Sequence, residues 1–252
     1  FVRGPEVGAF EAECASACGS PAAVGVGNGT DAITLALRAL GVGTGDEVII
    51  PAMTAAFTGL AVVAAGARPR IVDVEPDALT LDASACAAAV NSRTKAIVPV
   101  HLYGQPADMD AIRRVADRHA LAIVEDCCQA HLATGHGVPV GTRSHAGAFS
   151  FYPTKNLAAL GDGGAVITGD RALADRVRRL RNGGQRDRYH HDDPGVNSRL
   201  DELQAAVLRA RLPLLAGWTA RRRELAALYR RELPGGLQPV AERERRMIEV
   251  AR

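Results

Sequence analysis

Short apolar runs alternate with stretches of helical composition along most of this chain. The runs with the length and apolar content of buried strands are residues 48–50, 70–74, 96–100, 121–125, 146–151 and 165–168. The stretches between them with helical length and composition are residues 30–40, 55–66, 82–91, 108–119 and 170–181. This alternation predicts an α/β fold in which a largely parallel sheet carries helices on both faces. Ligands of such folds bind at the carboxyl ends of the strands.

Composition narrows the class of protein. The chain has 252 residues, 47% of them hydrophobic, and a net charge of +2, which allows one large core or two smaller ones. Its arginines are interleaved with acids and form no basic stripe with aromatics, so we expect no nucleic-acid partner. No apolar run has membrane-spanning length, no signal peptide opens the chain, and five cysteines fit a reduced compartment. We therefore expect a cytoplasmic protein without a membrane partner.

Two polar clusters could suggest a metal site. Cys127, Cys128 and His131 lie close in sequence, but no second ligand pair has matching spacing, so we expect no metal. The His-His-Asp-Asp run at 190–193 is better explained as an exposed loop.

Lysine is rare in this chain, which otherwise uses arginine. Only Lys95 and Lys155 occur among 30 basic residues, and Lys155 lies just past an apolar run. Arginine stays protonated, whereas a lysine amine can lose its proton and form an imine with a carbonyl. The alternative is that Lys155 is an ordinary surface residue, as we expect Lys95 to be.

A glycine-rich turn at 24–33 joins a short strand to a helix. It is neither a dinucleotide fingerprint, because Thr30 replaces the third glycine, nor a P-loop, because the lysine is missing. The N–H groups of Gly29 and Thr30 would lie at a helix N-terminus, which suits a phosphate. An ordinary capped turn is the alternative.

Acidic and amide side chains follow the strand predicted at 121–125. Asp126 could keep a ring nitrogen protonated, and Gln129 could hydrogen-bond a phenolic oxygen of the same ring. Alternatively, Asp126 is the N-cap of a following helix.

A phosphate turn, an acid at a strand end and a lysine after a later strand are the parts that a pyridoxal phosphate site needs. The chain resembles the sugar aminotransferases of the DegT/DnrJ/EryC1/StrS family, pyridoxal-phosphate enzymes of fold type I that act on keto sugars. The motifs that carry the resemblance lie at residues 4–7, 10–11, 29–32, 45–48, 99–104, 125–126, 150–156, 161–164 and 197–204.

The resemblance implies a fold and a chemistry. The fold would be the aspartate-aminotransferase-like large domain, with a mostly parallel seven-stranded sheet. Lys155 would form the internal Schiff base and later move a proton. Asp126 would pair with the pyridine nitrogen, and Gln129 would lie beside the ring hydroxyl.

The resemblance also implies a phosphate site that two chains share. Gly29, Thr30 and the Ser150 hydroxyl would hold the phosphate. Asn197 matches the family position that reaches the partner's phosphate, so we expect a homodimer with a shared active site.

Residue 155 is a lysine, and not the histidine of the family's dehydratases, which favours transamination. The expected reaction moves an amino group from glutamate or glutamine to a keto group of a nucleotide-linked (deoxy)sugar by a ping-pong Schiff base mechanism. One alternative is a cyclitol or aminoshikimate-type ketone as substrate. Another is a truncated, non-catalytic cofactor-binding partner subunit. A nicotinamide dehydrogenase is the weakest alternative, because the glycine pattern fails.

The chain departs from the family pattern in two places. Ala55 stands where an aromatic residue usually stacks on the cofactor ring; either Phe57 replaces it or the ring is held less tightly. We expect residues 1–212 to form the cofactor-binding large domain. A long helix is expected from Asp201 to about Leu233, and Pro213 would bend or interrupt it. Residues 213–252 would hold the long helix beyond this proline and the start of a missing small domain. The chain is thus expected to be truncated at both ends.

Overall fold

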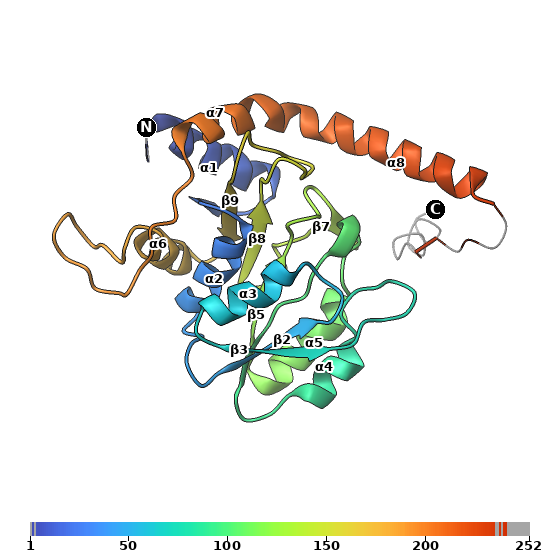
Figure 1. The fold of residues 1–252 in the computed structure, drawn as a ribbon, viewed down its shortest axis with the longest axis horizontal. Helices are drawn as coiled ribbons and strands as arrows, with labels where there is room; N and C mark the ends of the chain where they lie inside the picture. The colour runs from blue at the N-terminus through green and yellow to red at the C-terminus, as the bar shows by residue number, and fades with distance from the viewer. Residues whose placement is uncertain (1, 3, 235–236, 238, 241–252) are drawn as a thin grey trace.

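The computed structural model describes residues 2, 4–234, 237 and 239–240. At its centre is a seven-stranded sheet with the strand order β1-β9-β8-β5-β4-β2-β3 (Figure 1). Its strands are β1 (Ala22–Val26), β2 (Glu47–Pro51), β3 (Arg68–Val72), β4 (Thr94–Ile97), β5 (Ala122–Asp126), β8 (Ala146–Ser150) and β9 (Gly164–Thr168). β9 is antiparallel to both neighbours, and the other neighbouring pairs are parallel. The predicted α/β fold with a mostly parallel seven-stranded sheet is confirmed.

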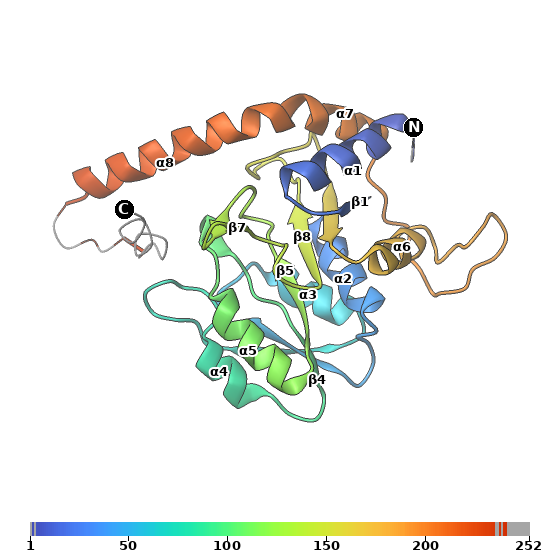
Figure 2. The same ribbon diagram turned by 180° about the vertical axis from the view of Figure 1, so that it is seen from behind.

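Helices cover both faces of the sheet (Figures 1 and 2). One face packs against α2 (Gly29–Ala39), α3 (Ala56–Ala64) and α6 (Arg171–Leu180). The opposite face packs against α1 (Pro5–Ala17), α4 (Ala83–Ala89), α5 (Met109–His119) and α7 (Glu202–Arg211). Successive strand residues alternate between the two cores, as the period of two requires: Val48 and Ile50 face α2 and α3, whereas Ile49 faces α4 and α5.

The predicted helices and strands occur within a few residues of their predicted positions, but α1 was not predicted. Its N-cap, Gly4, offers no side-chain cap. Instead, the Glu202 carboxylate accepts hydrogen bonds from the backbone N–H groups of Gly4, Glu6 and Val7, at 2.7, 3.0 and 3.0 Å. A distant acid therefore satisfies the free N–H groups of this helix. The short hairpin of β6 (Thr134–Gly135) and β7 (Val138–Pro139) and the 3₁₀ turn η1 (Leu102–Gly104) were not predicted either.

The predicted interruption at Pro213 is confirmed. α7 ends at Arg211, a 3₁₀ turn η2 (Leu212–Leu214) contains the proline, and α8 (Leu215–Glu232) continues beyond it. α8 extends away from α1 and α7 (Figure 1), and Leu215 is its only buried residue in the described part of the chain. The polar stretch 241–252 lies outside the described residues. No helix among the described residues is long and apolar enough to cross a bilayer.

Chain direction brings the motif residues to one edge of the sheet. Because β9 is antiparallel to both β1 and β8, β1 runs parallel to β8 and hence to β5, β4 and β2. The carboxyl ends of these strands therefore share an edge. The glycine turn follows β1, His101 follows β4, Asp126 ends β5, and Ser150 ends β8.

Candidate active site

The glycine turn packs directly against the end of β8. Asn28 caps α2, its side-chain oxygen accepting from the Asp31 N–H at 2.8 Å. A Cβ placed on Gly29 would lie 2.6 Å from Ser150 Cβ and 2.9 Å from Cys128 Sγ, so only glycine fits here. The first turn of α2, with Gly29 and Thr30, therefore lies against Ser150, as the phosphate-site prediction requires.

Asp126 is buried, with one donor on each carboxylate oxygen. Its Oδ2 accepts from the Thr58 hydroxyl at 2.8 Å and its Oδ1 from the Cys128 N–H at 3.1 Å. Thr58 in turn lies 2.8 Å from the Thr54 hydroxyl. The alternative that Asp126 caps a helix is wrong, because β5 is followed by turns and the β6–β7 hairpin.

Thr58 is a site residue that the sequence analysis missed. Thr54 lies just before α3 and Thr58 in its first turn, and their hydroxyl groups are in contact. Their i, i+4 spacing is a usable signal only when β2 is already known to lie near β5. Phe57, the possible replacement for the missing ring-stacking aromatic, is 63% exposed.

The Gln129 side chain is held in one orientation. Its Oε1 accepts a hydrogen bond from the Tyr103 N–H at 2.9 Å. Because a backbone N–H can only donate, the amide oxygen must face Tyr103, which leaves the Gln129 amino group available as a donor. Such a donor suits the oxygen of a ring hydroxyl.

Lys155 lies in the turn after β8 and is half-buried. Among the described residues, no acid lies within ion-pair distance of its amine. Burial and the charge of Asp126 raise the pKa of Cys128 well above its usual value, and the charge of Lys155 opposes them. Cys128 is therefore a neutral thiol, and both predicted residues, Asp126 and Lys155, lie near it.

Asn197 is not brought into contact with the other predicted residues. It is exposed, and its side chain forms no hydrogen bond with the described part of the chain. Its neighbour Ser198 accepts from the Gly27 N–H at 2.9 Å and donates to Asp31 at 2.6 Å, which ties this segment to the glycine turn. The role of Asn197 in a partner's site stays a prediction.

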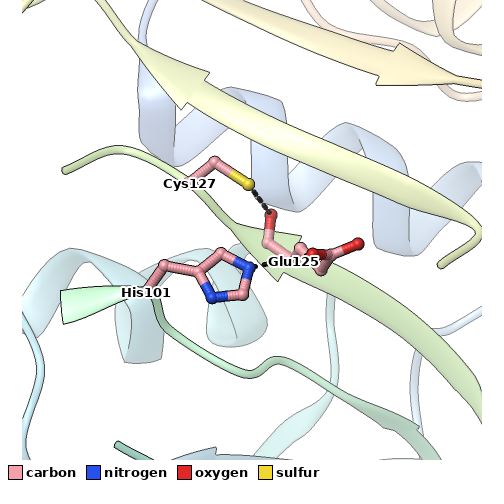
Figure 3. Close-up of side chains that lie close together, drawn as sticks. All are labelled: His101, Glu125 and Cys127. Carbon is pink, nitrogen blue, oxygen red and sulfur yellow. Dashed lines mark hydrogen bonds and ion pairs between the residues drawn. The ribbon is translucent and has the colours of Figure 1, made fainter. Parts of the chain in front are cut away.

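A second polar cluster lies on the other side of β5. His101, Glu125 and Cys127 are buried, and their ligand atoms lie within 4.8 Å of one another (Figure 3). His101 Nδ1 accepts from the Ala107 N–H at 3.0 Å, so the ring proton is on Nε2 and is donated to Glu125 Oε2 at 2.9 Å. Neither ring nitrogen keeps a lone pair for a metal.

Three more groups donate to Glu125. The N–H of Gly141, the N–H of Arg143 and the Ser144 hydroxyl lie 2.8, 3.1 and 2.8 Å from its oxygens. Burial alone would raise the pKa of Glu125, but hydrogen bonds from His101, Gly141 and Ser144 outweigh it and lower the pKa. Burial also keeps the pKa of Cys127 high, so its thiol is protonated. This cluster is hydrogen-bonded throughout and acts as a structural support.

Comparison with known proteins agrees with this geometry. The model of the DegT/DnrJ/EryC1/StrS aminotransferase family matches residues 1–247. A dTDP-3-amino-3,4,6-trideoxy-alpha-D-glucose transaminase from Streptomyces venezuelae is 55% identical over 235 residues, which are 93% of this chain and 62% of that protein. This chain thus spans less than two thirds of that relative's length.

Solved structures are similar over the same region. The crystal structure of S. venezuelae DesV in complex with a ketimine intermediate has a TM-score of 0.91 and 55% identity, over 93% of this chain and 63% of that chain. The structure of NtdA from Bacillus subtilis with bound cofactor PMP has a TM-score of 0.80 and 35% identity, over 85% and 49%. The chain belongs to the DegT/DnrJ/EryC1/StrS aminotransferase family.

Proposed function

We propose that this chain is the cofactor-binding part of a pyridoxal-phosphate-dependent transaminase acting on a nucleotide-linked keto sugar. One observation carries the proposal: the carboxyl ends of β1, β5 and β8 share one edge of the sheet. At this edge lie Lys155, which has no ion pair among the described residues, the buried carboxylate of Asp126, and the contact between Gly29 and Ser150. The similar protein from Streptomyces venezuelae is a dTDP-sugar transaminase, which supports this reaction class and a dTDP-linked sugar, and PMP in a related structure supports the cofactor.

The residues fit the cofactor group by group. The N–H groups of Gly29 and Thr30 and the Ser150 hydroxyl would bind the phosphate at the N-terminus of α2, where Gly29 packs against Ser150. Asp126, oriented by Thr58, would hold a proton on the ring nitrogen. The Gln129 amino group would donate to the ring hydroxyl.

Bound pyridoxal phosphate would supply an electron sink for carbanion chemistry. Lys155 would attach it through its amine and then carry a proton to and from the substrate carbon. No acid forms an ion pair with this amine in the described part of the chain. Glutamate or glutamine would be the amino donor in a ping-pong cycle.

The proposal includes the assembly. We propose a cytoplasmic homodimer in which Asn197 of each chain reaches the partner's phosphate, consistent with five free cysteines. Residues 1–212 would be the cofactor-binding domain, and residues 213–252 would begin a second domain. If this chain instead serves as a non-catalytic subunit, transamination would occur only after mixing with a full-length homologue.

The first test is the visible absorption of purified protein with pyridoxal phosphate, followed by borohydride reduction and peptide mapping. We expect a visible band and an adduct on Lys155. Lys155→Ala should lose both, and Lys95→Ala, which changes the other lysine, should keep both. A band of equal strength in Lys155→Ala would refute the assignment of this lysine.

A further inference from the structure

Cys14 and Cys18 lie one turn apart at the end of α1. The Cys18 N–H donates to the Cys14 carbonyl at 3.0 Å, which closes the last turn of the helix. Residues four apart on a helix lie on the same side of it, and both cysteines pack into the core that α1 shares with β8 and α7. Cys14 is only 3% exposed, whereas Cys18 is half-buried. One reachable and one buried thiol therefore face the same part of the core.

The two thiols border a small gap in this core. The gap has a volume of about 10 Å³, and its other walls include Phe149, Phe151 and His131. No charged side chain lines it among the described residues, because burial lowers the pKa of His131 to about 4 and keeps its ring neutral. The gap gives the two sulfur atoms room to move, but its apolar walls disfavour any product that carries a charge.

A metal ion does not fit this pair of thiols. Structural metal sites take four ligands, and a metal would need both thiols in the charged form. The described residues contain one group of three close metal-ligand side chains, around His101, and neither Cys14 nor Cys18 belongs to it. A disulfide needs no further ligand and carries no charge, so it suits these surroundings.

The two thiols also differ in acidity. A hydrogen bond from Cys14 stabilises the Cys18 thiolate and lowers the pKa of Cys18, although burial acts in the opposite direction. The same hydrogen bond, together with burial, raises the pKa of Cys14 well above its usual value. Burial raises the pKa of Cys86 to about 12 and also raises those of Cys127 and Cys128. Among the five cysteines, Cys18 is thus the one with a lowered pKa, which is typical of an attacking thiol beside a resolving thiol.

We propose that Cys14 and Cys18 form a reversible dithiol–disulfide site, in which Cys18 attacks a low-molecular-weight disulfide and Cys14 resolves the product. The Cys18 thiolate attacks one sulfur of the small disulfide, which forms a mixed disulfide and releases one small thiolate. That thiolate takes the Cys14 proton. The Cys14 sulfur then attacks the Cys18 sulfur and releases the second small thiolate, which takes up the proton that Cys18 had given to water. One small disulfide is consumed, two small thiols leave and one protein disulfide forms.

Helix geometry makes this bond possible and easy to reduce. Cα atoms four residues apart on a helix are about 6 Å apart, within the range of about 4.4–6.8 Å found in disulfides. The Cβ atoms, at about 5–6 Å, are further apart than the about 3.5–4.5 Å that a disulfide prefers. Cys18 ends the helix, and Gly19 follows with a φ of 65°, so the last turn can tighten without moving the rest of α1. A disulfide closed in this way is readily reduced, as regulatory disulfides are.

The test treats the reduced full-length chain with 2-hydroxyethyl disulfide, an uncharged oxidant, followed by an acid quench and peptide mapping. Both cysteines lie in the peptide of residues 4–38, because no lysine or arginine occurs between Arg3 and Arg38. We expect this peptide to become lighter by two hydrogen atoms without an adduct, and to return to its original mass with dithiothreitol. Cys18 should react at least about 10-fold faster than Cys86, since the Cys86 thiolate is far less populated.

Three variants assign the roles. Cys14→Ala should stop the reaction at the mixed disulfide, so the peptide gains one 2-hydroxyethylthio group and keeps it. Cys18→Ala should yield neither product. Cys86→Ala is the matched control and should form the cross-link as the wild-type chain does, because Cys86 lies in the separate core beside α4 and α5.

Three outcomes would overturn the proposal: a mixed disulfide on Cys18 that persists in the wild-type chain, equal rates at Cys18 and Cys86, or no reaction of the native chain where the urea-unfolded chain reacts. All three are measured on the wild-type chain, so none depends on the folding of a variant. The cofactor plays no part in the measurement, and its result is therefore independent of the proposed function.

Discussion

His101 and His131 are both buried, but their surroundings differ completely. Both ring nitrogens of His101 are hydrogen-bonded, to Ala107 and to Glu125, whereas neither nitrogen of His131 has a partner among the described residues. The first histidine belongs to a closed cluster that supports the turns after β4 and β5, and the second lines a cavity with two unpaired arginines. Hydrogen-bond saturation, and not burial, therefore distinguishes the two histidines.

Glu125 and Asp126, which are adjacent in β5, also differ in how many hydrogen bonds they receive. Glu125 receives four hydrogen bonds on the closed side, and Asp126 receives two on the side of the candidate active site. A carboxylate with four donors has little capacity left, while one with two can still bind a protonated ring nitrogen.

The largest effect is expected at Glu125. Glu125→Ala would leave the buried His101 ring and the N–H groups of Gly141 and Arg143 without this acceptor, and removing one partner of such a buried group costs about 3–5 kcal/mol. Urea denaturation would measure the loss in the free energy of unfolding. Glu224→Ala, on the exposed side of α8, is the control and should cost less than about 1 kcal/mol. If Glu125→Ala lowered the free energy of unfolding no more than Glu224→Ala does, the hydrogen-bonded cluster around Glu125 would not be the structural support that we describe.

His131 should make stability depend on pH. Its pKa is about 4 in the folded chain against 6.5 for a free imidazole, so the unfolded chain takes up protons first. Stability is complete above pH 6.5 and falls by about 3 kcal/mol as the pH drops toward 4. His131→Phe, whose ring would pack against Phe149 and Phe151, should lack this decrease. A pH slope unchanged in the variant would contradict the assignment.

Glu125 should cause a second loss of stability at a lower pH than the loss caused by His131, so the two regions can be distinguished in one pH series. Its folded pKa is lowered, so its contribution is present above its unfolded pKa, about 4.3, and is lost as the pH falls through the folded value. His131→Phe should keep this lower transition.

A smaller effect is expected at Thr58. Thr58→Val removes the hydroxyl that donates to Asp126 while keeping the side-chain shape, at a cost of about 1–2 kcal/mol. Cofactor affinity, measured from the visible band, should also decrease because Asp126 is less well oriented. The Thr54→Val variant, one step further from Asp126, should affect the affinity less. Equal effects of the two substitutions would show that Thr58 does not position the carboxylate.

The smallest effect is expected at Ser144. Ser144→Ala removes one of the four donors to Glu125, and the remaining three keep the carboxylate satisfied. We expect a loss of about 1 kcal/mol or less in a thermal or urea denaturation, with no change in the cofactor band. A loss approaching that of Glu125→Ala would mean that the cluster lacks the redundancy we describe.

Much of the fold and part of the candidate site could be predicted from sequence. The alternation of apolar runs predicted the sheet, since buried parallel strands must be apolar on both faces. The motifs placed Asp126 and Ser150 at strand ends, and a common strand direction then brings such residues together. Thr58 and His131 could not be assigned, because their importance depends on which groups lie across from them.

The sequence by itself determined the local order of this protein: strand and helix positions, the interruption at Pro213, and the chemistry available at Lys155. These depend on residue types within one or two turns of chain. Tertiary structure alone decided the cap of α1 by Glu202, 198 residues from Gly4, and the Thr58–Asp126 hydrogen bond across 68 residues. It also decided that α8 borders the His131 cavity. Such contacts have no local signal, because a side chain's hydrogen-bond partners are set by packing between elements and not by its neighbours in sequence.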